Sequence, residues 1–401
     1  MALRHRLAPS ARAGDVVGAA RSLVCLHATD PASVHLSAWA RVEGMVVSDM
    51  EAALYRDRAL VKHLAMRRTL FVFPREAMTV AQAGVSSRVA NSERRRLIRD
   101  VEHAGVHPDG QRWLSAACEQ VLAALSGGRE ATSSQLRDKL PTLRGSTTYG
   151  EGKSWGGQVP VGPRVLTVLS AAGRIVRASN DGGWTASRPR WASMKSWLGQ
   201  ELPPRPEADA VSSLVERWLR AFGPGTAADI KWWLGSTLGA VRRALAGLDA
   251  VEVALDGRTG YVLPDDLEAT EPVEPWAALL PPLDPSTMGW LERDWYLGPH
   301  KQHVFDTNGN AGATAWWDGR IVGGWRQGEN REIELQLLED VGADGELALS
   351  QEAERLTAWL GGTRVVPRFP SPLSKRGLTP ARTSGSWRRS PAPSRRTTGG
   401  R

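Results

Sequence analysis

The chain has 401 residues, of which 41% are hydrophobic and 23% charged, a composition typical of a folded globular protein. This length predicts several domains or one repeated architecture. There is no run of 18 apolar residues and no apolar segment near Met1, so we expect neither a membrane span nor a secretory signal. Cys25 and Cys118 are too few for a zinc framework and are typical of a reduced, cytoplasmic protein.

The net charge of +8 is unevenly distributed along the chain. Residues 374–401 contain eight basic residues and no acid, so this segment carries the whole excess. Residues 1–205 contain 29 basic and 17 acidic residues, whereas residues 206–373 contain 14 and 26. The basic first half indicates a polyanionic partner, although a solvated basic surface would give the same count.

Residues 1–74 are predicted to contain three helices and a closing strand. Helices are expected over 16–26, from Pro31 to Trp39, and from Ser48 through residue 54. Asp30 and Pro31 form a favourable pair for the cap and the first position of the second helix. The strand is expected over 69–73, and residues 75–110 then form a basic, helical connector.

Residues 111–200 are predicted to repeat the same order. Helices are expected near 114–125, 133–140 and 164–171, followed by a hairpin over 174–184. The Gly-rich segment 144–163 lacks the Gly-Lys-Ser/Thr ending of a phosphate-binding loop. It is therefore either a mobile connection or a clamp on nucleic acid.

Residues 207–264 give the clearest pattern. Apolar residues between 211 and 222 recur every three or four positions and predict a helix. Thr226 and Asp229 form a capping box for a second helix, and a third follows from residue 238. Two alternating strands around 251–263 complete a winged helix-turn-helix. Because the two preceding units have the same order, the sequence predicts three tandem winged helices.

The last part of the chain differs in character. Aromatic-rich strands, an Asp-Gly hairpin turn at Asp318 and a helix over 347–360 predict a small β-barrel or curved sheet capped by one helix over 270–372. Residues 373–401 are rich in Ser, Pro, Arg, Gly and Thr and are expected to be disordered. The predicted fold class is α+β.

The winged-helix pattern predicts a DNA-binding surface. Such a unit can place its third helix in the major groove and its wing along phosphates. The basic residues on or beside these elements are Lys62, Arg67, Arg68, Arg164, Arg242 and Arg243. Winged helices also serve as protein–protein modules, so an interaction scaffold is an alternative. His300 and His303 have no further ligand at metal-binding spacing, so we expect no metal and no cofactor.

The segment from residue 26 to residue 31 contains a candidate pair of catalytic side chains. His27 and Thr29 flank Ala28 at the end of the first predicted helix. A neutral imidazole can accept a proton or orient water, and a hydroxyl can donate and accept. In the structural alternative, Asp30 caps the next helix, Thr29 bonds the local backbone and His27 is a core residue.

The sequence resembles the AlkZ/YcaQ type of winged-helix DNA glycosylases over about residues 1–373. The residues that carry this resemblance lie at 26–31, 38–41, 68–72, 219–224 with Asp229 and Trp233, 283–285, 288–290, 293–294, 308–312 and 323–325. The resemblance implies three winged helices in a C-shaped arrangement with a C-terminal β-barrel. It also implies a monomeric, nucleoid-associated enzyme that needs no cofactor and removes bulky alkylated or crosslinked bases from double-stranded DNA.

The resemblance also assigns the candidate catalytic residues. The family's motif is Gln-apolar-Gln or Gln-apolar-Asp, and His27 and Thr29 occupy these two polar positions. We expect a neutral His27 to orient water. The rate of base release should therefore rise with pH through the imidazole range, about 6.5. The alternative is a non-catalytic DNA-binding protein on the same scaffold.

Overall fold

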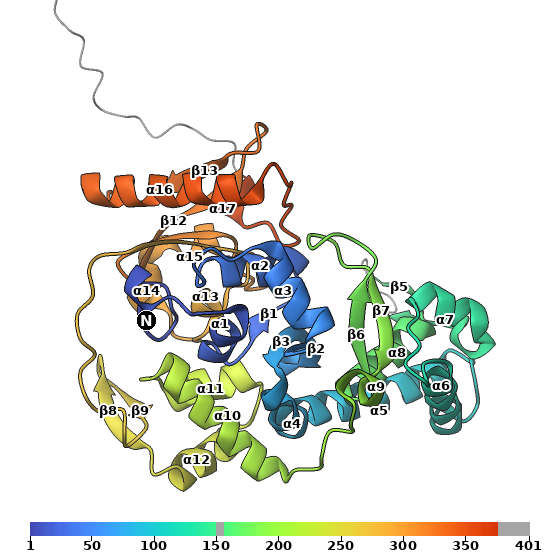
Figure 1. The fold of residues 1–401 in the computed structure, drawn as a ribbon. Helices are drawn as coiled ribbons and strands as arrows, with labels where there is room; N and C mark the ends of the chain where they lie inside the picture. The colour runs from blue at the N-terminus through green and yellow to red at the C-terminus, as the bar shows by residue number, and fades with distance from the viewer. Residues whose placement is uncertain (150–155, 376–401) are drawn as a thin grey trace, which may run out of the picture.

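Residues 1–149 and 156–375 are described by the computed structural model. Within these ranges, helices alternate with small antiparallel sheets of two to four strands (Figure 1). None of the described helices combines the length and the apolar character needed to cross a bilayer. The chain is therefore a mixed helix-and-sheet protein, as the sequence predicted at the level of fold class.

The N-terminal unit is built on a three-stranded sheet with the order β1-β3-β2. Its elements are η1 (Pro9–Ala11), α1 (Val16–Ser22), β1 (Leu26–His27), α2 (Pro31–Trp39), α3 (Val47–Glu51), η2 (Ala52–Arg56), β2 (Leu60–Ala65), η3 (Met66–Arg68) and β3 (Thr69–Pro74). The third helix begins one residue before the predicted Ser48. The carboxylate of Asp49 accepts a hydrogen bond from the N–H of Val46 at 2.9 Å and so stabilises this helix start.

A helical connector leads into the second unit. The connector contains η4 (Arg75–Ala77), α4 (Met78–Ala81), η5 (Gln82–Ser86) and α5 (Ser87–His103). The unit contains α6 (Gly110–Ala124), α7 (Ser133–Lys139), η6 (Pro141–Leu143), β4 (Ser146–Tyr149), β5 (Gly157–Pro160), α8 (Val161–Ala171), β6 (Ile175–Asn180), β7 (Pro189–Ser193) and α9 (Met194–Leu198). The two ends of the Gly-rich segment pair as the β4–β5 hairpin. Its tip, residues 150–155, lies outside the described residues.

The third unit follows the predicted order of three helices and a hairpin. Its elements are α10 (Glu207–Phe222), α11 (Ala227–Leu234), α12 (Leu238–Gly247), β8 (Val251–Leu255) and β9 (Arg258–Val262). The capping box is confirmed, because Thr226 Oγ1 accepts from the N–H of Asp229 at 3.1 Å and Asp229 Oδ2 accepts from the N–H of Thr226 at 3.0 Å. Gly225 lies against the Trp218 ring, where a Cβ would be only 2.3 Å away.

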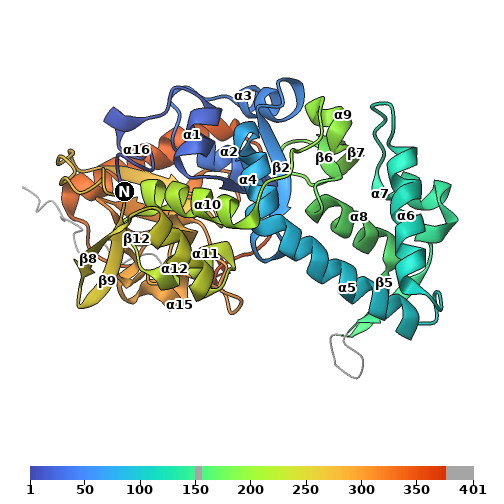
Figure 2. The same ribbon diagram turned by 90° about the horizontal axis from the view of Figure 1, so that it is seen from below.

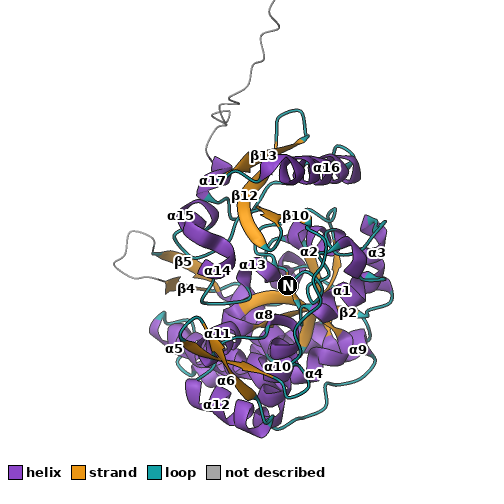
Figure 3. Cartoon of the chain, turned by 90° about the vertical axis from the view of Figure 1, so that its left-hand side faces the viewer, coloured by secondary structure: helices purple, strands orange, loops and turns teal. Residues whose placement is uncertain are grey.

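The C-terminal unit is an antiparallel sheet with the order β10-β11-β12-β13. Its elements are β10 (Ala277–Leu280), α13 (Pro285–Met288), α14 (Asp294–Leu297), η7 (Gly298–His300), α15 (Lys301–Val304), β11 (Thr314–Trp317), β12 (Arg320–Gln327), β13 (Ile333–Leu337), α16 (Gly342–Leu360) and α17 (Pro372–Lys375). Helix α16 covers this sheet (Figure 3). Strands β10 and β13 are the two edges among the described strands, so the predicted closed barrel is not confirmed.

The start of the predicted disordered tail is folded, contrary to the prediction. The expected disordered segment begins at residue 373, yet Leu373 is 3% exposed within α17 and lies close to Gly324 of β12. The rest of that segment, residues 376–401, lies outside the described residues.

Buried apolar side chains form two separate clusters. One joins the N-terminal, third and C-terminal units, and the other holds residues between 97 and 191. Helix α5 crosses from one to the other, with Ala90 in the first cluster and Leu97 in the second (Figure 2). Its 17 residues span about 25 Å. Strand β6 also lies between them, because Val176 packs in the first cluster and Ile175 in the second.

A fully buried ion pair fixes α2 to the C-terminal unit. Arg41, just beyond α2, donates to both carboxylate oxygens of Asp284, at 2.7 and 2.9 Å, and neither side chain is exposed. Arg41 also donates to the carbonyl of His5 and to Ser286 Oγ, while Ser37 Oγ donates to Asp284. Because nearly every donor and acceptor is used, the pair can be held without water.

We expect Arg41→Met to lower the free energy of unfolding by about 3–5 kcal/mol, because Asp284 would remain buried without its partner. Urea denaturation of the purified protein measures this loss. The control is Arg220→Met, which removes an exposed pair with Asp265 and should cost about 1 kcal/mol or less. Equal losses for the two variants would show that the buried pair does not hold the units together.

Candidate active site

His27 lies in a short strand and not at the end of a helix. Helix α1 ends at Ser22, and Val24 has a φ of 67°, which a right-handed helix does not accommodate. The chain then turns so that Leu26 and His27 pair with β3, with His27 opposite Phe71. The predicted helix through residue 26 is therefore wrong, because pairing with a distant strand overrides the local apolar pattern.

The imidazole of His27 is held in the neutral form. The residue as a whole is partly exposed, but its ring is enclosed and packs edge-on against the Phe71 ring, with 5.2 Å between ring centroids. Burial of the imidazole and the positive charge of Arg67 lower the pKa of His27 to about 3. Nδ1 accepts a long hydrogen bond of 3.4 Å from the N–H of Thr29, which favours a proton on Nε2. The prediction that His27 titrates near neutral pH, and that the rate rises with pH there, is therefore wrong.

Thr29 and Asp30 connect the site to the C-terminal end of the structure. Asp30 caps α2 as predicted, since its Oδ1 accepts from the N–H of Ala32 at 3.2 Å. Its Oδ2 accepts from the N–H of Arg368 at 3.0 Å, and the Arg368 guanidinium donates to the Thr29 carbonyl at 3.3 Å. Burial raises the pKa of Asp30, against the lowering effect of these hydrogen bonds. Each carboxylate oxygen of Asp30 thus accepts a hydrogen bond from the backbone, which agrees with its predicted role as a cap.

A tight turn between β2 and β3 places Arg67 beside the site. Arg67 and Arg68 both have positive φ, 52° and 62°, a conformation that is uncommon for residues other than glycine. The Arg67 guanidinium lies 4.3 Å from the ring centroid of Trp232 in α11, and Arg293 lies 5.1 Å from the same ring. Arg68 instead forms an ion pair with Glu93 at 3.2 Å. The N-terminal and third units therefore meet at this turn.

The other predicted DNA-binding residues are dispersed. Lys62 is partly buried and donates to the Tyr55 hydroxyl at 2.6 Å. Arg164 is engaged internally, by an ion pair with Asp100 at 2.5 Å and a hydrogen bond to Thr147. Arg242 and Arg243 are exposed on α12, which Figure 1 shows beyond α11 as seen from β1. The structure thus brings Lys62 and Arg67 toward the candidate pair, whereas Arg68 is engaged by Glu93. Arg164, Arg242 and Arg243 lie on other elements.

Sequence reasoning missed Arg177 and Arg368. Arg177 lies in β6 and lines a small cavity together with Lys62 and Ala28, the residue between the two candidate catalytic positions. Arg368 follows α16 and contacts Thr29 from 339 residues away. No short motif connects these positions, so only the fold brings them together.

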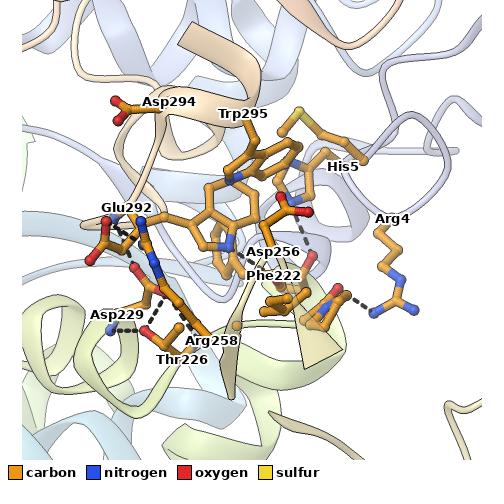
Figure 4. A pocket seen from close by; sticks show the side chains of 17 residues that line it. Arg4, His5, Phe222, Thr226, Asp229, Asp256, Arg258, Glu292, Asp294 and Trp295 are labelled. Atoms are coloured by element: carbon orange, nitrogen blue, oxygen red, sulfur yellow. Dashed lines mark hydrogen bonds and ion pairs between the residues drawn. The ribbon is translucent and has the colours of Figure 1, made fainter. Parts of the chain in front are cut away.

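A separate cavity of about 490 Å³ lies between the third and C-terminal units (Figure 4). Its lining contains none of the predicted site residues, but it includes the carboxylates of Asp256, Glu292 and Asp294. Asp229, also in its lining, accepts hydrogen bonds from the N–H groups of Leu291 and Glu292, both at 2.9 Å. Its four carboxylates outnumber the two guanidinium groups of Arg4 and Arg258 in the same lining. This excess of negative charge opposes a phosphate backbone, so we do not place the DNA site here.

The described residues hold no cluster of three or more His, Cys, Asp or Glu side chains that could bind a metal ion. His300 forms a contact of 2.9 Å with Glu339. The contact with Glu339 thus accounts for the position of the His300 side chain.

We expect His27 to stay neutral in the folded protein down to about pH 4, because its folded pKa lies well below the value of about 6.5 in an unfolded chain. The unfolded state then binds the proton more strongly, so the contribution of His27 to stability falls as pH drops below about 6.5. NMR of imidazole ¹⁵N shifts between pH 4 and pH 8 measures this directly, with the urea-unfolded protein as the control. A folded-state transition near pH 6.5 would contradict the assignment.

The comparisons with known proteins bear on the fold and the family. The family model described as DNA glycosylase AlkZ-like matches residues 20–359. Among solved structures, the Streptomyces sahachiroi DNA glycosylase AlkZ matches with a TM-score of 0.70 and 21% sequence identity, and the match covers 92% of this chain and 96% of that chain. That identity supports the fold alone, and no curated protein matches. Because the family model spans most of the sequence, the chain belongs to the AlkZ-like family of DNA glycosylases.

Proposed function

We propose that this protein is a monofunctional DNA glycosylase that hydrolyses the N-glycosidic bond of bulky alkylated or crosslinked bases in double-stranded DNA. The observation that carries this proposal is the neutral His27 beside Thr29, at the two polar positions of the family's motif. Family membership supports glycosylase chemistry. The substrate class, the use of a divergent His-apolar-Thr motif, the absence of a cofactor and a monomeric, nucleoid-associated state are part of the proposal.

The chemistry suits a neutral site. An N7-alkylated purine is cationic and already a good leaving group, so a strong general acid is not required. The site must orient water and tolerate positive charge on the sugar in the transition state. A protonated His27 would oppose that charge, and the low pKa of His27 prevents this. Nε2–H of His27 and the hydroxyl of Thr29 are then the groups that orient water or the sugar.

We also propose how the scaffold holds DNA. Residues 1–74, 111–200 and 207–264 act as tandem winged helices, joined by the connector 75–110 and followed by the C-terminal unit 270–372. The order of helices and hairpin in the third unit supports this assignment. Lys62, Arg67, Arg68, Arg242 and Arg243 are the proposed phosphate contacts from the predicted set. Arg164 instead braces α8 against α5 through Asp100.

A second candidate function is a non-catalytic DNA-binding protein on the same scaffold. One observation favours it: the cavity beside Ala28 has neither His27 nor Thr29 in its lining. Duplex binding by the wild type without release of any alkylated base would select this candidate.

We expect His27→Ala to slow base release by about 100-fold or more, because a group that orients water or the sugar is lost. Affinity for the same duplex should stay within a few-fold. The measurement is single-turnover release of 7-alkylguanine from an alkylated duplex, followed by mass spectrometry. His107→Ala, which changes a partly exposed histidine before α6, is the matched control and should release base at the wild-type rate. Unchanged release by His27→Ala would remove His27 from the mechanism.

A further inference from the structure

Three cationic side chains from distant parts of the chain surround the segment Ala28–Thr29. Lys62 in β2 and Arg177 in β6 line one small cavity together with Ala28. The guanidinium of Arg368 donates to the Thr29 carbonyl at 3.3 Å. The positive charge of Arg177 acts on Lys62, and that of Arg368 acts on Arg177. The three charges are thus close enough to repel one another.

No carboxylate forms a close ion pair with this cluster within the described ranges. None of the three side chains has an acidic oxygen within 4.0 Å. Glu51 acts on Lys62 and Asp30 acts on Arg368 only at longer range, and the oxygens of Asp30 accept from the backbone N–H groups of Ala32 and Arg368. The Nε atom of Arg177 is buried and has no hydrogen-bond partner in the described structure. A buried donor without an acceptor is costly unless a ligand or water satisfies it.

The repulsion lowers pKa values within the cluster. Burial and the charge of Arg177 lower the pKa of Lys62 to about 8, and burial and the charge of Arg368 lower the pKa of Arg177. A bound anion would offset both effects, because it brings the missing negative charge and acceptor oxygens.

The cluster differs from an ordinary exposed basic patch. Lys62 and Arg177 are partly buried, and their positions are fixed: Lys62 donates to the Tyr55 hydroxyl at 2.6 Å, and Arg177 lies 5.4 Å from the ring centroid of Trp191. The cavity between them is narrow, about 20 Å³, which is room for about one water-sized group. It therefore admits a single oxygen of an anion and excludes a base or a sugar.

We propose that Lys62, Arg177 and Arg368 form an anion notch that binds one backbone phosphate of DNA next to the target nucleotide. One phosphate oxygen enters between Lys62 and Arg177, and Arg368 contacts the same phosphate from the side of Thr29. This assignment rests on the proposed function, because it takes the segment His27–Thr29 as the place where the target sugar sits. It adds two residues, Arg177 and Arg368, that no sequence motif indicates.

The test uses the full chain and an undamaged duplex, so that it does not depend on catalysis. Fluorescence anisotropy gives the binding constant between about 50 and 200 mM salt, and each lost phosphate contact should reduce the slope of log K against log salt by about 0.9. Arg177→Met should show this reduction, whereas Arg177→Lys keeps the charge and should keep the wild-type slope. Lys62→Met should reproduce the effect of Arg177→Met. Lys301→Met, an exposed lysine of α15, is the control.

A wild-type slope in Arg177→Met, or an equal reduction in Lys301→Met, would overturn the notch. Absence of duplex binding by the wild type would overturn both the notch and the proposed function. If the wild type releases base but Arg177→Met has the same slope of log K against log salt as the wild type, the proposed function stands and the notch is refuted. The expected slope changes without base release from any alkylated duplex would support the notch and refute the glycosylase.

Discussion

The buried pair between Arg41 and Asp284 is the constraint on which the rest of the arrangement depends. It fixes the end of α2 to the C-terminal unit, with both side chains fully enclosed. Helix α2 begins directly after Asp30, which also holds the backbone of Arg368. The segment from His27 to Asp30 is therefore held on one side by pairing with β3 and on the other by a helix that cannot shift against the C-terminal unit.

This rigid position gives the site its electrostatic character. His27 is neutral because burial and the charge of the nearby Arg67 guanidinium both disfavour a further proton. The unpaired charges of Lys62, Arg177 and Arg368 nearby would repel a cationic sugar if no anion were bound. In the proposed complex, a phosphate between Lys62 and Arg177 would supply the missing negative charge. The contact between this phosphate and the two side chains would then both bind the DNA and offset the positive charge on the sugar in the transition state.

The parts of the fold that depend on local signals could be predicted from the sequence. The third unit follows from helical periodicity and the capping box at Thr226, and α2 follows from Asp30 and Pro31. The strand at His27 could not be predicted, because its two residues gain stability only by pairing with β3. The same limit applies to the site, since Arg368 reaches Thr29 only through the tertiary fold. The pKa of His27 likewise depends on burial that no local pattern reveals.

The most direct test of this account is a crystal structure of the protein with a duplex that carries a pyrrolidine mimic of the cationic sugar. The account predicts that the mimic lies within hydrogen-bonding distance of His27 or Thr29 and that an adjacent phosphate lies between Lys62 and Arg177. A duplex bound with its sugar mimic away from the segment 27–29, for example at the acidic cavity of the third unit, would contradict it.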